Sequence, residues 1–170
     1  MEVQSDSKHS PQIRRVVTRD NDKGKSCIWL DDYLSNHKFL EDLTSSSVWA
    51  TCCTPAHFLD AEDMGERILG TSPPVNGTRF CVVEIKPGTT LNGHRTDSLD
   101  YVICLSGEIT LLLDEAETIL KPGEILIQRG TTHAWANRGH VAARLACILI
   151  DGVPKRTGSL SGYDQADSSE

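Results

Sequence analysis

The sequence lacks the features that mark membrane, secreted, nucleotide-binding and nucleic-acid-binding proteins. No apolar run approaches the about 20 residues that a membrane-spanning helix needs. Residues 1–10 contain no apolar segment that would act as a secretory signal. The net charge of −7 at pH 7 disfavours nucleic acid and anionic membranes as partners. No glycine-rich phosphate-binding pattern is present, so we expect no nucleotide cofactor.

The cysteines give no sign of a disulfide framework or a zinc motif. None of the six cysteines forms a CxxC pair, and Cys81, Cys104 and Cys147 lie inside apolar segments typical of strands. Buried, reduced thiols act as small apolar side chains. Because reduced thiols are typical of the cytosol, we expect a cytoplasmic protein.

What is present is a regular series of short apolar segments from residue 78 onward. Glycine or proline turns separate these segments at intervals of about 8–12 residues, a spacing typical of an all-β sandwich or barrel. Nothing resembles the strand–helix alternation of a parallel sheet. The 170 residues suit a single domain. We therefore expect an all-β, antiparallel barrel whose core spans residues 78–152.

Residues 11–77 predict an N-terminal arm of strands and loops. Segments 12–18 and 26–30 are typical of two strands around a turn cluster at residues 20–24, and residues 47–51 predict another short strand. A weak helical signal surrounds Leu40. Residues 55–69 predict a loop with one helical turn, and a loop of this length is often a lid or a dimer arm. The polar ends, residues 1–10 and 153–170, are expected to be disordered and flexible.

Two histidines stand at turns within the expected barrel. His94 and His133 each lie beside an apolar strand, and antiparallel strands fold back on one another. We therefore expect the two imidazoles to meet inside the barrel mouth. Imidazoles with an ordinary pKa near ~6.5 suit proton transfer near neutral pH.

The segments around these histidines resemble the two motifs of the cupin superfamily. Residues 88–107 match the first motif, in which a His-x-His pair and a later carboxylate lie between two glycines. Residues 123–137 match the second motif, which contains His133, although they are one residue short and have glutamine in place of proline. The amino-acid sequence of these segments also resembles that of small cupins found near natural-product enzymes. The resemblance implies a jelly-roll barrel with a ligand cavity and a homodimer.

Two positions depart from the family pattern. Thr96 stands where the second histidine of the pair is expected, and Asp100 replaces the glutamate. A complete cupin site offers three histidines and one carboxylate to an Fe, Mn, Ni, Zn or Cu ion. The resemblance implies one divalent metal held less tightly by His94, Asp100 and His133, since two histidines and a carboxylate suffice in other sites. A metal-free cavity is the alternative, and both stay open here.

In the metal-free alternative, His94, His133 and Asp100 are the candidate catalytic residues, with Asp100 orienting one imidazole. The candidate substrate-binding residues are Tyr101, Trp135, Thr96 and Arg129. Trp135 follows His133 by two positions, so both face the same side of a strand, either as cavity wall or as core. Arg129 would meet an anionic substrate or lie on the surface.

These features favour a small-molecule enzyme of secondary metabolism acting inside the barrel. We expect a lyase or isomerase that decarboxylates, dehydrates or isomerises an organic-acid or polyketide-like substrate. His94 and His133 would serve as acid and base or as metal ligands. A metal-dependent dioxygenase and a non-enzymatic binding protein are the alternatives, because a fold alone does not decide function.

Overall fold

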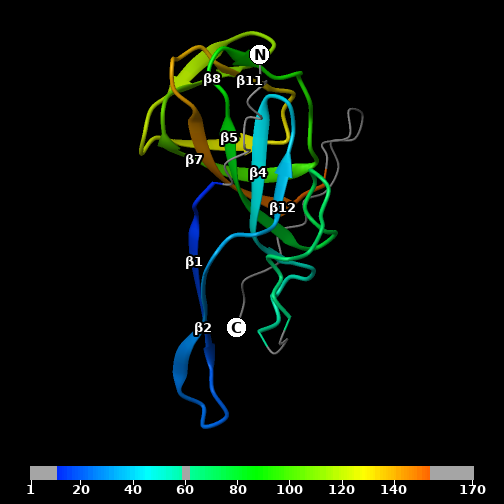
Figure 1. Cartoon of the computed structure of the whole chain (residues 1–170). Helices are drawn as coiled ribbons and strands as arrows, with labels where there is room; N and C mark the ends of the chain where they lie inside the picture. Colours follow the sequence, from blue (N-terminus) through cyan, green and yellow to red (C-terminus); the bar gives the residue numbers. More distant parts are fainter. Residues whose placement is uncertain (1–10, 59–61, 154–170) are drawn as a thin grey trace, which may run out of the picture.

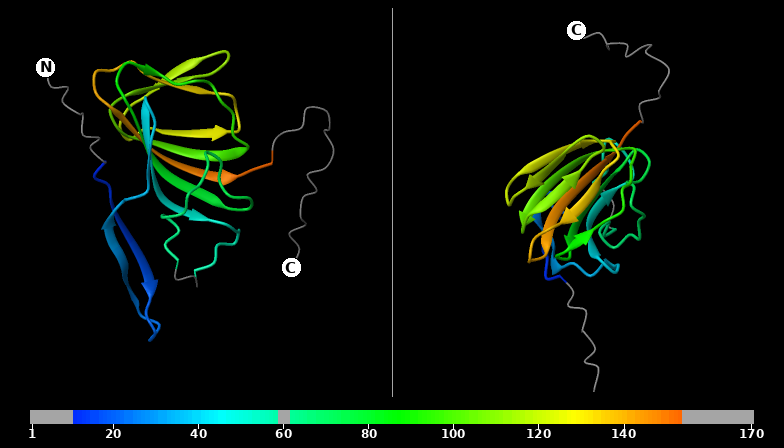
Figure 2. Two further views of the ribbon diagram at one scale, coloured as in Figure 1. Left: turned by 45° about the vertical axis from the view of Figure 1, so that its right-hand side comes forward. Right: turned by 90° about the horizontal axis from the view of Figure 1, so that it is seen from above.

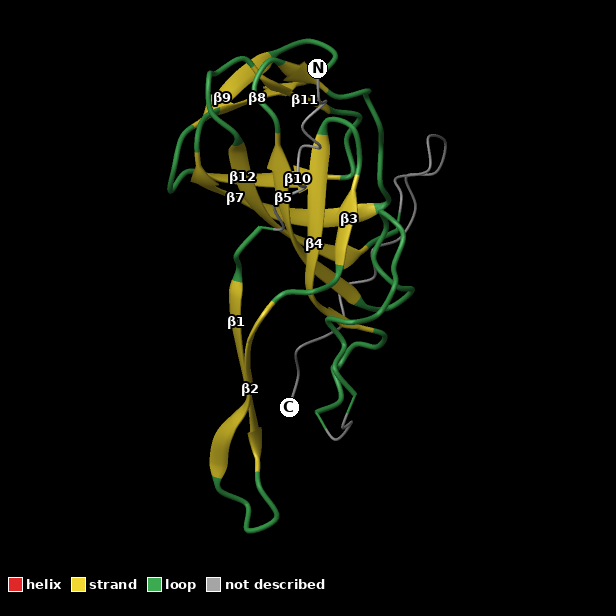
Figure 3. Ribbon diagram, viewed as in Figure 1, coloured by secondary structure: helices red, strands yellow, loops and turns green. Residues whose placement is uncertain are grey.

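A computed structural model describes residues 11–58 and 62–153, and every regular element within them is a strand (Figure 3). The strands are β1 (Arg14–Asp20), β2 (Ser26–Tyr33), β3 (His37–Phe39), β4 (Leu43–Thr51), β5 (Thr78–Ile85), β6 (Thr89–Thr90), β7 (Ser98–Ser106), β8 (Ile109–Leu112), β9 (Glu117–Leu120), β10 (Ile125–Arg129), β11 (Ala134–Asn137) and β12 (Ala143–Asp151). The all-β prediction is confirmed. The described part contains no helix suited to crossing a membrane. The predictions for residues 1–10 and for the tail after Val153 lie outside the described residues.

Two antiparallel sheets stack to form the barrel (Figures 1 and 2). The six-stranded sheet has the order β10-β7-β12-β5-β4-β3, and the four-stranded sheet has the order β6-β11-β8-β9. Strands far apart in the chain are neighbours in both sheets, as in a jelly roll. The predicted antiparallel jelly-roll barrel is therefore observed.

The pleat of the strands decides which side chains enter the barrel. On β5, alternate residues Arg79, Cys81, Val83 and Ile85 all face one cavity, because successive side chains of a strand point to opposite faces. The apolar core next to this cavity is formed by buried residues of both sheets: Ile85, Val102, Cys104, Ile109, Leu111, Leu120, Trp135, Ala143 and Leu145. Core and cavity therefore share one interior.

The N-terminal hairpin is a separate sheet. Strands β1 and β2 pair only with each other, around a turn in which Gly24 adopts a φ of 66°. Figures 1 and 2 show the hairpin extending away from the barrel. The later arm strands behave differently, since β4 pairs with β5 and so extends the six-stranded sheet. The predicted hairpin is thus observed, and it joins neither barrel sheet.

The helical signals in the arm were wrong for the described residues. Around Leu40 the chain makes a tight turn, in which the Leu40 amide donates to the Leu43 carbonyl at 2.9 Å and joins β3 to β4. Pairing with the sheet overrides a weak local propensity. Between residues 55 and 69 the described parts contain turns, bends and irregular backbone but no helix, and residues 59–61 lie outside the description.

One buried arginine fastens the hairpin to this loop. The Arg15 guanidinium donates to both carboxylate oxygens of Asp32 and of Asp63, over distances of 2.7–3.0 Å. Arg15 is only 6% exposed, and Gly65 leaves it room, because a Cβ there would lie 2.1 Å from the guanidinium. The Arg15 interaction also lowers the pKa of Asp32.

We predict that Arg15→Ala lowers the free energy of unfolding by roughly 2–3 kcal/mol. The value falls below the 3–5 kcal/mol of a fully buried pair because Asp32 and Asp63 are partly exposed. Chemical denaturation monitored by tryptophan fluorescence measures it. The matched control is the neighbouring Arg14→Ala, whose ion pair with Asp31 is solvent-exposed, so its unfolding midpoint should stay nearly unchanged. Equal effects for the two variants would contradict the fastening role of Arg15.

Candidate functional site

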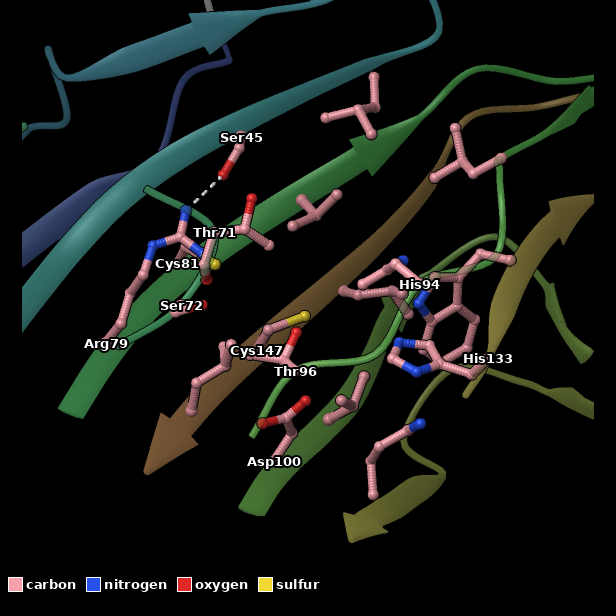
Figure 4. A pocket seen from close by; sticks show the side chains of 18 of the residues that line it. Ser45, Thr71, Ser72, Arg79, Cys81, His94, Thr96, Asp100, His133 and Cys147 are labelled. Atoms are coloured by element: carbon pink, nitrogen blue, oxygen red, sulfur yellow. Dashed lines mark hydrogen bonds between the residues drawn. The ribbon is translucent and has the colours of Figure 1, made fainter. Parts of the chain in front are cut away.

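His94 and His133 form a cross-strand pair, as the sequence predicted. Each donates its backbone amide to the backbone carbonyl of the other, at 2.9 and 3.0 Å. Their ring centroids lie 4.4 Å apart, with the planes inclined at 54° (Figure 4). His133 is buried and His94 is exposed. The two rings therefore meet where the cavity wall reaches solvent.

A β-bulge aims His94 into the cavity. The Leu91 amide donates to the Trp135 carbonyl, and the next paired residues are His94 and His133. Two residues, Asn92 and Gly93, thus oppose the single Ala134. In a regular strand, Leu91 and His94 would face opposite sides because they are three positions apart. With the bulge, both line the cavity. Bulges beside functional sites commonly redirect a side chain in this way.

Hydrogen bonding fixes the tautomer of His133. Its Nδ1 lies 3.0 Å from the Thr131 carbonyl oxygen, which only accepts, so Nδ1 carries the hydrogen. In the neutral ring, Nε2 then keeps a free lone pair. Burial lowers the pKa of His133, a shift that the Thr131 hydrogen bond opposes in part. His133 is therefore a neutral base near pH 7.

Asp100 lines the same cavity but does not orient an imidazole. It is buried on β7, and its Oδ1 accepts a hydrogen bond of 2.6 Å from the Ser98 hydroxyl. Burial raises the pKa of Asp100, while the Ser98 hydrogen bond lowers it in part. The prediction that Asp100 fixes an imidazole tautomer is corrected, because the Thr131 carbonyl does so for His133.

The three expected metal ligands do not assemble into one donor set. Within residues 11–58 and 62–153, no three His, Cys, Asp or Glu side chains are arranged so that they would hold a metal ion. Thr96, in place of a histidine, is buried in the cavity wall and supplies only a neutral hydroxyl. As arranged, these residues do not fit the metal of a complete cupin site.

The predicted substrate-binding residues divide between the two faces of their strands. Trp135 and Thr96 line the cavity, and the Trp135 ring meets His133 edge-on, with centroids 5.9 Å apart. Trp135 also belongs to the core, so both of its predicted roles hold. Tyr101 and Arg129 are exposed and do not line the cavity. Their predicted substrate-binding roles are corrected, and for Arg129 the alternative surface position is the one observed. Inward-facing Asp100 and Gln128 precede them, and the pleat turns the next side chain outward.

Sequence reasoning overlooked Gln128 and Arg79. Gln128 is 3% exposed, and its Nε2 donates to the Thr131 carbonyl and hydroxyl oxygens at 3.1 and 3.0 Å. Its Oε1 is buried and has no hydrogen-bond partner among the described residues. Buried carbonyl oxygens are rarely left unpaired, so this atom suits a donor group on a ligand. Strand parity within residues 125–129 was the signal that would have found Gln128.

The cavity has the size of a small-molecule site. Its volume is about 480 Å³, within the range of roughly 300–1,000 Å³ typical of ligand pockets. Its walls come from both sheets, and the loop residues Gly70, Thr71 and Ser72 also line it. An apolar interior with a histidine pair and a few convergent polar groups is typical of small-molecule sites.

Comparison with known proteins identifies the family. The chain matches the Cupin domain family over residues 81–149. It is 31% identical to "Phomopsin biosynthesis cluster protein C'" of Diaporthe leptostromiformis, over 98% of this chain and 97% of that protein. It is 29% identical to "Cupin-domain-containing oxidoreductase virC" of Hypocrea virens, over 85% of this chain and 80% of that protein. The chain belongs to the cupin family.

A solved structure shares the fold. The cupin domain of Schizosaccharomyces pombe Cnp3 superposes with a TM-score of 0.52 and covers 81% of this chain and 87% of that one. At 15% identity, the likeness concerns the barrel alone.

We predict that Thr96→His tightens Zn²⁺ binding about tenfold or more, because it adds a third imidazole to a cavity that holds two. Competition with a chromogenic chelator and metal analysis of the dialysed protein measure the change without any activity assay. Thr118→His, at an exposed position of β9 that does not line the cavity, is the matched control and should bind as the wild type does. If Thr96→His and the wild type have the same affinity, Thr96 does not face the histidine pair as described.

Proposed function

We propose that the protein is a small-molecule enzyme of secondary metabolism whose reaction is a proton transfer inside the barrel. The observation that carries the proposal is the histidine pair, whose ring centroids lie 4.4 Å apart. In this pair, His133 is neutral and its Nε2 lone pair is free. Relatives named for the phomopsin and oryzine biosynthesis clusters support the setting in secondary metabolism. The reaction class is that of a lyase or isomerase.

The two imidazoles divide the work in this proposal. His133 Nε2 removes a proton from a substrate carbon activated by a neighbouring carbonyl group. His94, which is exposed at the cavity wall, supplies a proton and recovers it from solvent. Return of the proton to another carbon completes an isomerisation. Protonation of a hydroxyl group on the adjacent carbon releases water and completes a dehydration, and neither reaction needs an oxidant.

The cavity walls favour such a transfer. Trp135 presents a flat apolar surface beside His133, which suits a planar substrate. The buried Oε1 of Gln128 would accept a hydrogen bond from a substrate hydroxyl group. Low polarity around the reacting atoms strengthens each electrostatic contact compared with water.

A second candidate is a metal-dependent oxidoreductase, such as a dioxygenase. Several relatives that are named as oxidoreductases favour it, among them virC and fogC. It requires that His94, His133 and Asp100 rearrange around an ion, since they do not form a donor set as described. Fe²⁺-dependent consumption of O₂ by the wild-type protein would favour this candidate over proton transfer.

We predict that His133→Ala and His94→Ala each lower kcat about 10²-fold or more, the usual contribution of a positioned acid or base. The assay follows the loss of candidate β-hydroxy and enone acids by mass spectrometry. His140→Ala is the matched control, because His140 is exposed and does not line the cavity. Full activity in both site variants would refute the assignment.

The pH dependence supplies a further readout of the same assignment. A base must be unprotonated, and burial lowers the pKa of His133 below its ordinary 6.5. As the pH falls, the kcat/KM of the wild type should therefore decline with a midpoint below pH 6.5, the limb that reports the base. A midpoint above pH 6.5 on that limb would contradict His133 as the base.

We further propose that the protein acts as a cytoplasmic homodimer. All six cysteines are free, which suits a reducing compartment. The projecting β1–β2 hairpin carries exposed Val16, Ile28 and Tyr33, apolar surface that a second copy would cover. Sedimentation of the full chain should give a dimer that Ile28→Glu weakens. A monomer at all concentrations would contradict the dimer.

A further inference from the structure

The charge of the cavity differs in sign from the charge of the whole chain. The protein carries a net charge of −7, yet the residues that line the cavity include three cationic side chains, Lys38, Arg79 and Arg95. Asp100 is the only acidic residue among the described residues that line it. A cleft lined by charges of one sign attracts small ions of the opposite sign. A cationic hollow in an acidic protein therefore favours an anionic ligand.

Arg79 is the cation placed to bind that ligand. Lys38 and Arg95 are exposed, whereas Arg79 is half-buried and belongs to the inward row of β5. Its Nη1 donates to the Thr71 carbonyl at 3.1 Å and its Nη2 to the Ser45 hydroxyl at 3.2 Å. Both partners are neutral, and none of the ion pairs between described residues includes Arg79.

The contacts of Arg79 leave its main capacity unused. A guanidinium group has five N–H donors in a planar fork that matches a carboxylate with two parallel hydrogen bonds. A partly buried charge without a counter-ion is unfavourable, and an incoming carboxylate would neutralise it. The two neutral contacts hold the side chain in place, which lowers the entropy lost when an anion binds.

Arg79 and the histidine pair lie at opposite ends of the cavity. Figure 4 shows Arg79 with Ser45, Thr71, Ser72 and Cys81 at one end and His94 with His133 at the other, with Cys147 and Thr96 between them. A ligand anchored at Arg79 would extend along the row of β5 side chains toward the imidazoles.

We propose that Arg79 anchors a substrate carboxylate, so that the substrate is an organic acid whose reacting carbon lies at the histidine pair. This inference rests on the proposed function and narrows it. A carboxylate held at Arg79 is distant from the base and is retained in the product. Dehydration or isomerisation of an organic acid is thereby favoured over loss of that carboxyl group as CO₂.

The test uses a planar acid and its neutral analogue as probes. The probes are trans-cinnamate and cinnamamide, and binding to the full chain is followed by calorimetry and by tryptophan fluorescence. We expect cinnamate to bind at least about tenfold more tightly than cinnamamide, as a charge-assisted bidentate pair predicts. Equal affinity for the two probes, or no cinnamate binding at about 10 mM, roughly the weak limit for a specific site, would overturn the proposal.

Three variants locate the interaction. Arg79→Gln keeps an N–H donor for Thr71 but loses the charge. Its affinity for cinnamate should therefore fall about tenfold, while its affinity for cinnamamide stays within about twofold of the wild type. Arg79→Lys keeps the charge without the fork and should fall between. Arg129→Gln, on the exposed face of β10, should bind both probes as the wild type does. Cinnamate binding that Arg79→Gln leaves intact would overturn the proposal.

Probe binding and turnover together distinguish the proposed Arg79 anchor from the proposed proton transfer. If Arg79 only held the loop at Thr71, the Arg79→Gln substitution would weaken the binding of both probes alike and would lower the unfolding midpoint. If the anchor is correct and proton transfer is not, cinnamate binding will depend on Arg79 while no acid is turned over. If proton transfer is correct and the anchor is not, the His133→Ala variant will be inactive while Arg79→Gln keeps the wild-type KM.

Discussion

The pair of backbone hydrogen bonds between His94 and His133 is the constraint on which the site depends. Each bond contributes a net stabilisation of only about 0.5–1.5 kcal/mol, so the pair does not hold the barrel together. Its effect is positional. It continues the β6–β11 pairing past a bulge and thereby joins two segments far apart in the chain. The two imidazoles are neighbours because their backbones are.

From this constraint the chemistry of the cavity follows. The turn before β11 places the Thr131 carbonyl against His133 Nδ1, which leaves Nε2 as the acceptor. Burial keeps that ring neutral and also raises the pKa of Asp100. The same interior thus forms the apolar core and shifts the pKa values of His133 and Asp100. Core packing and the electrostatics of the site are therefore not independent.

The sequence was informative wherever the spacing alone decided the structure. Glycine and proline turns marked the strands of the barrel, and the two motifs located His94 and His133. The sequence was misleading where tertiary pairing decided, as at Leu40, where a tight β-turn between two strands replaced a weak helical signal. A local propensity does not record which strand lies beside it.

Strand parity explains the remaining errors in the site. Tyr101 and Arg129 were named as candidate substrate-binding residues, although each follows an inward residue and so points outward. Applied consistently, the alternation would have selected Gln128 instead of Arg129. Arg79 was beyond reach, because its role depends on the absence of a carboxylate partner among the described residues, and only coordinates show partners. The bulge at Asn92 and Gly93 likewise required the hydrogen-bond register.

The measurement that tests the central claim most directly is the tautomer and ionisation state of His133. Long-range ¹H–¹⁵N correlation spectra of the uniformly labelled protein at pH 7 distinguish the two neutral forms and the imidazolium. We expect a neutral ring protonated at Nδ1, with ring-to-ring nuclear Overhauser effects to His94. A ring protonated at Nε2, a charged ring, or the lack of any contact with His94 would contradict the account.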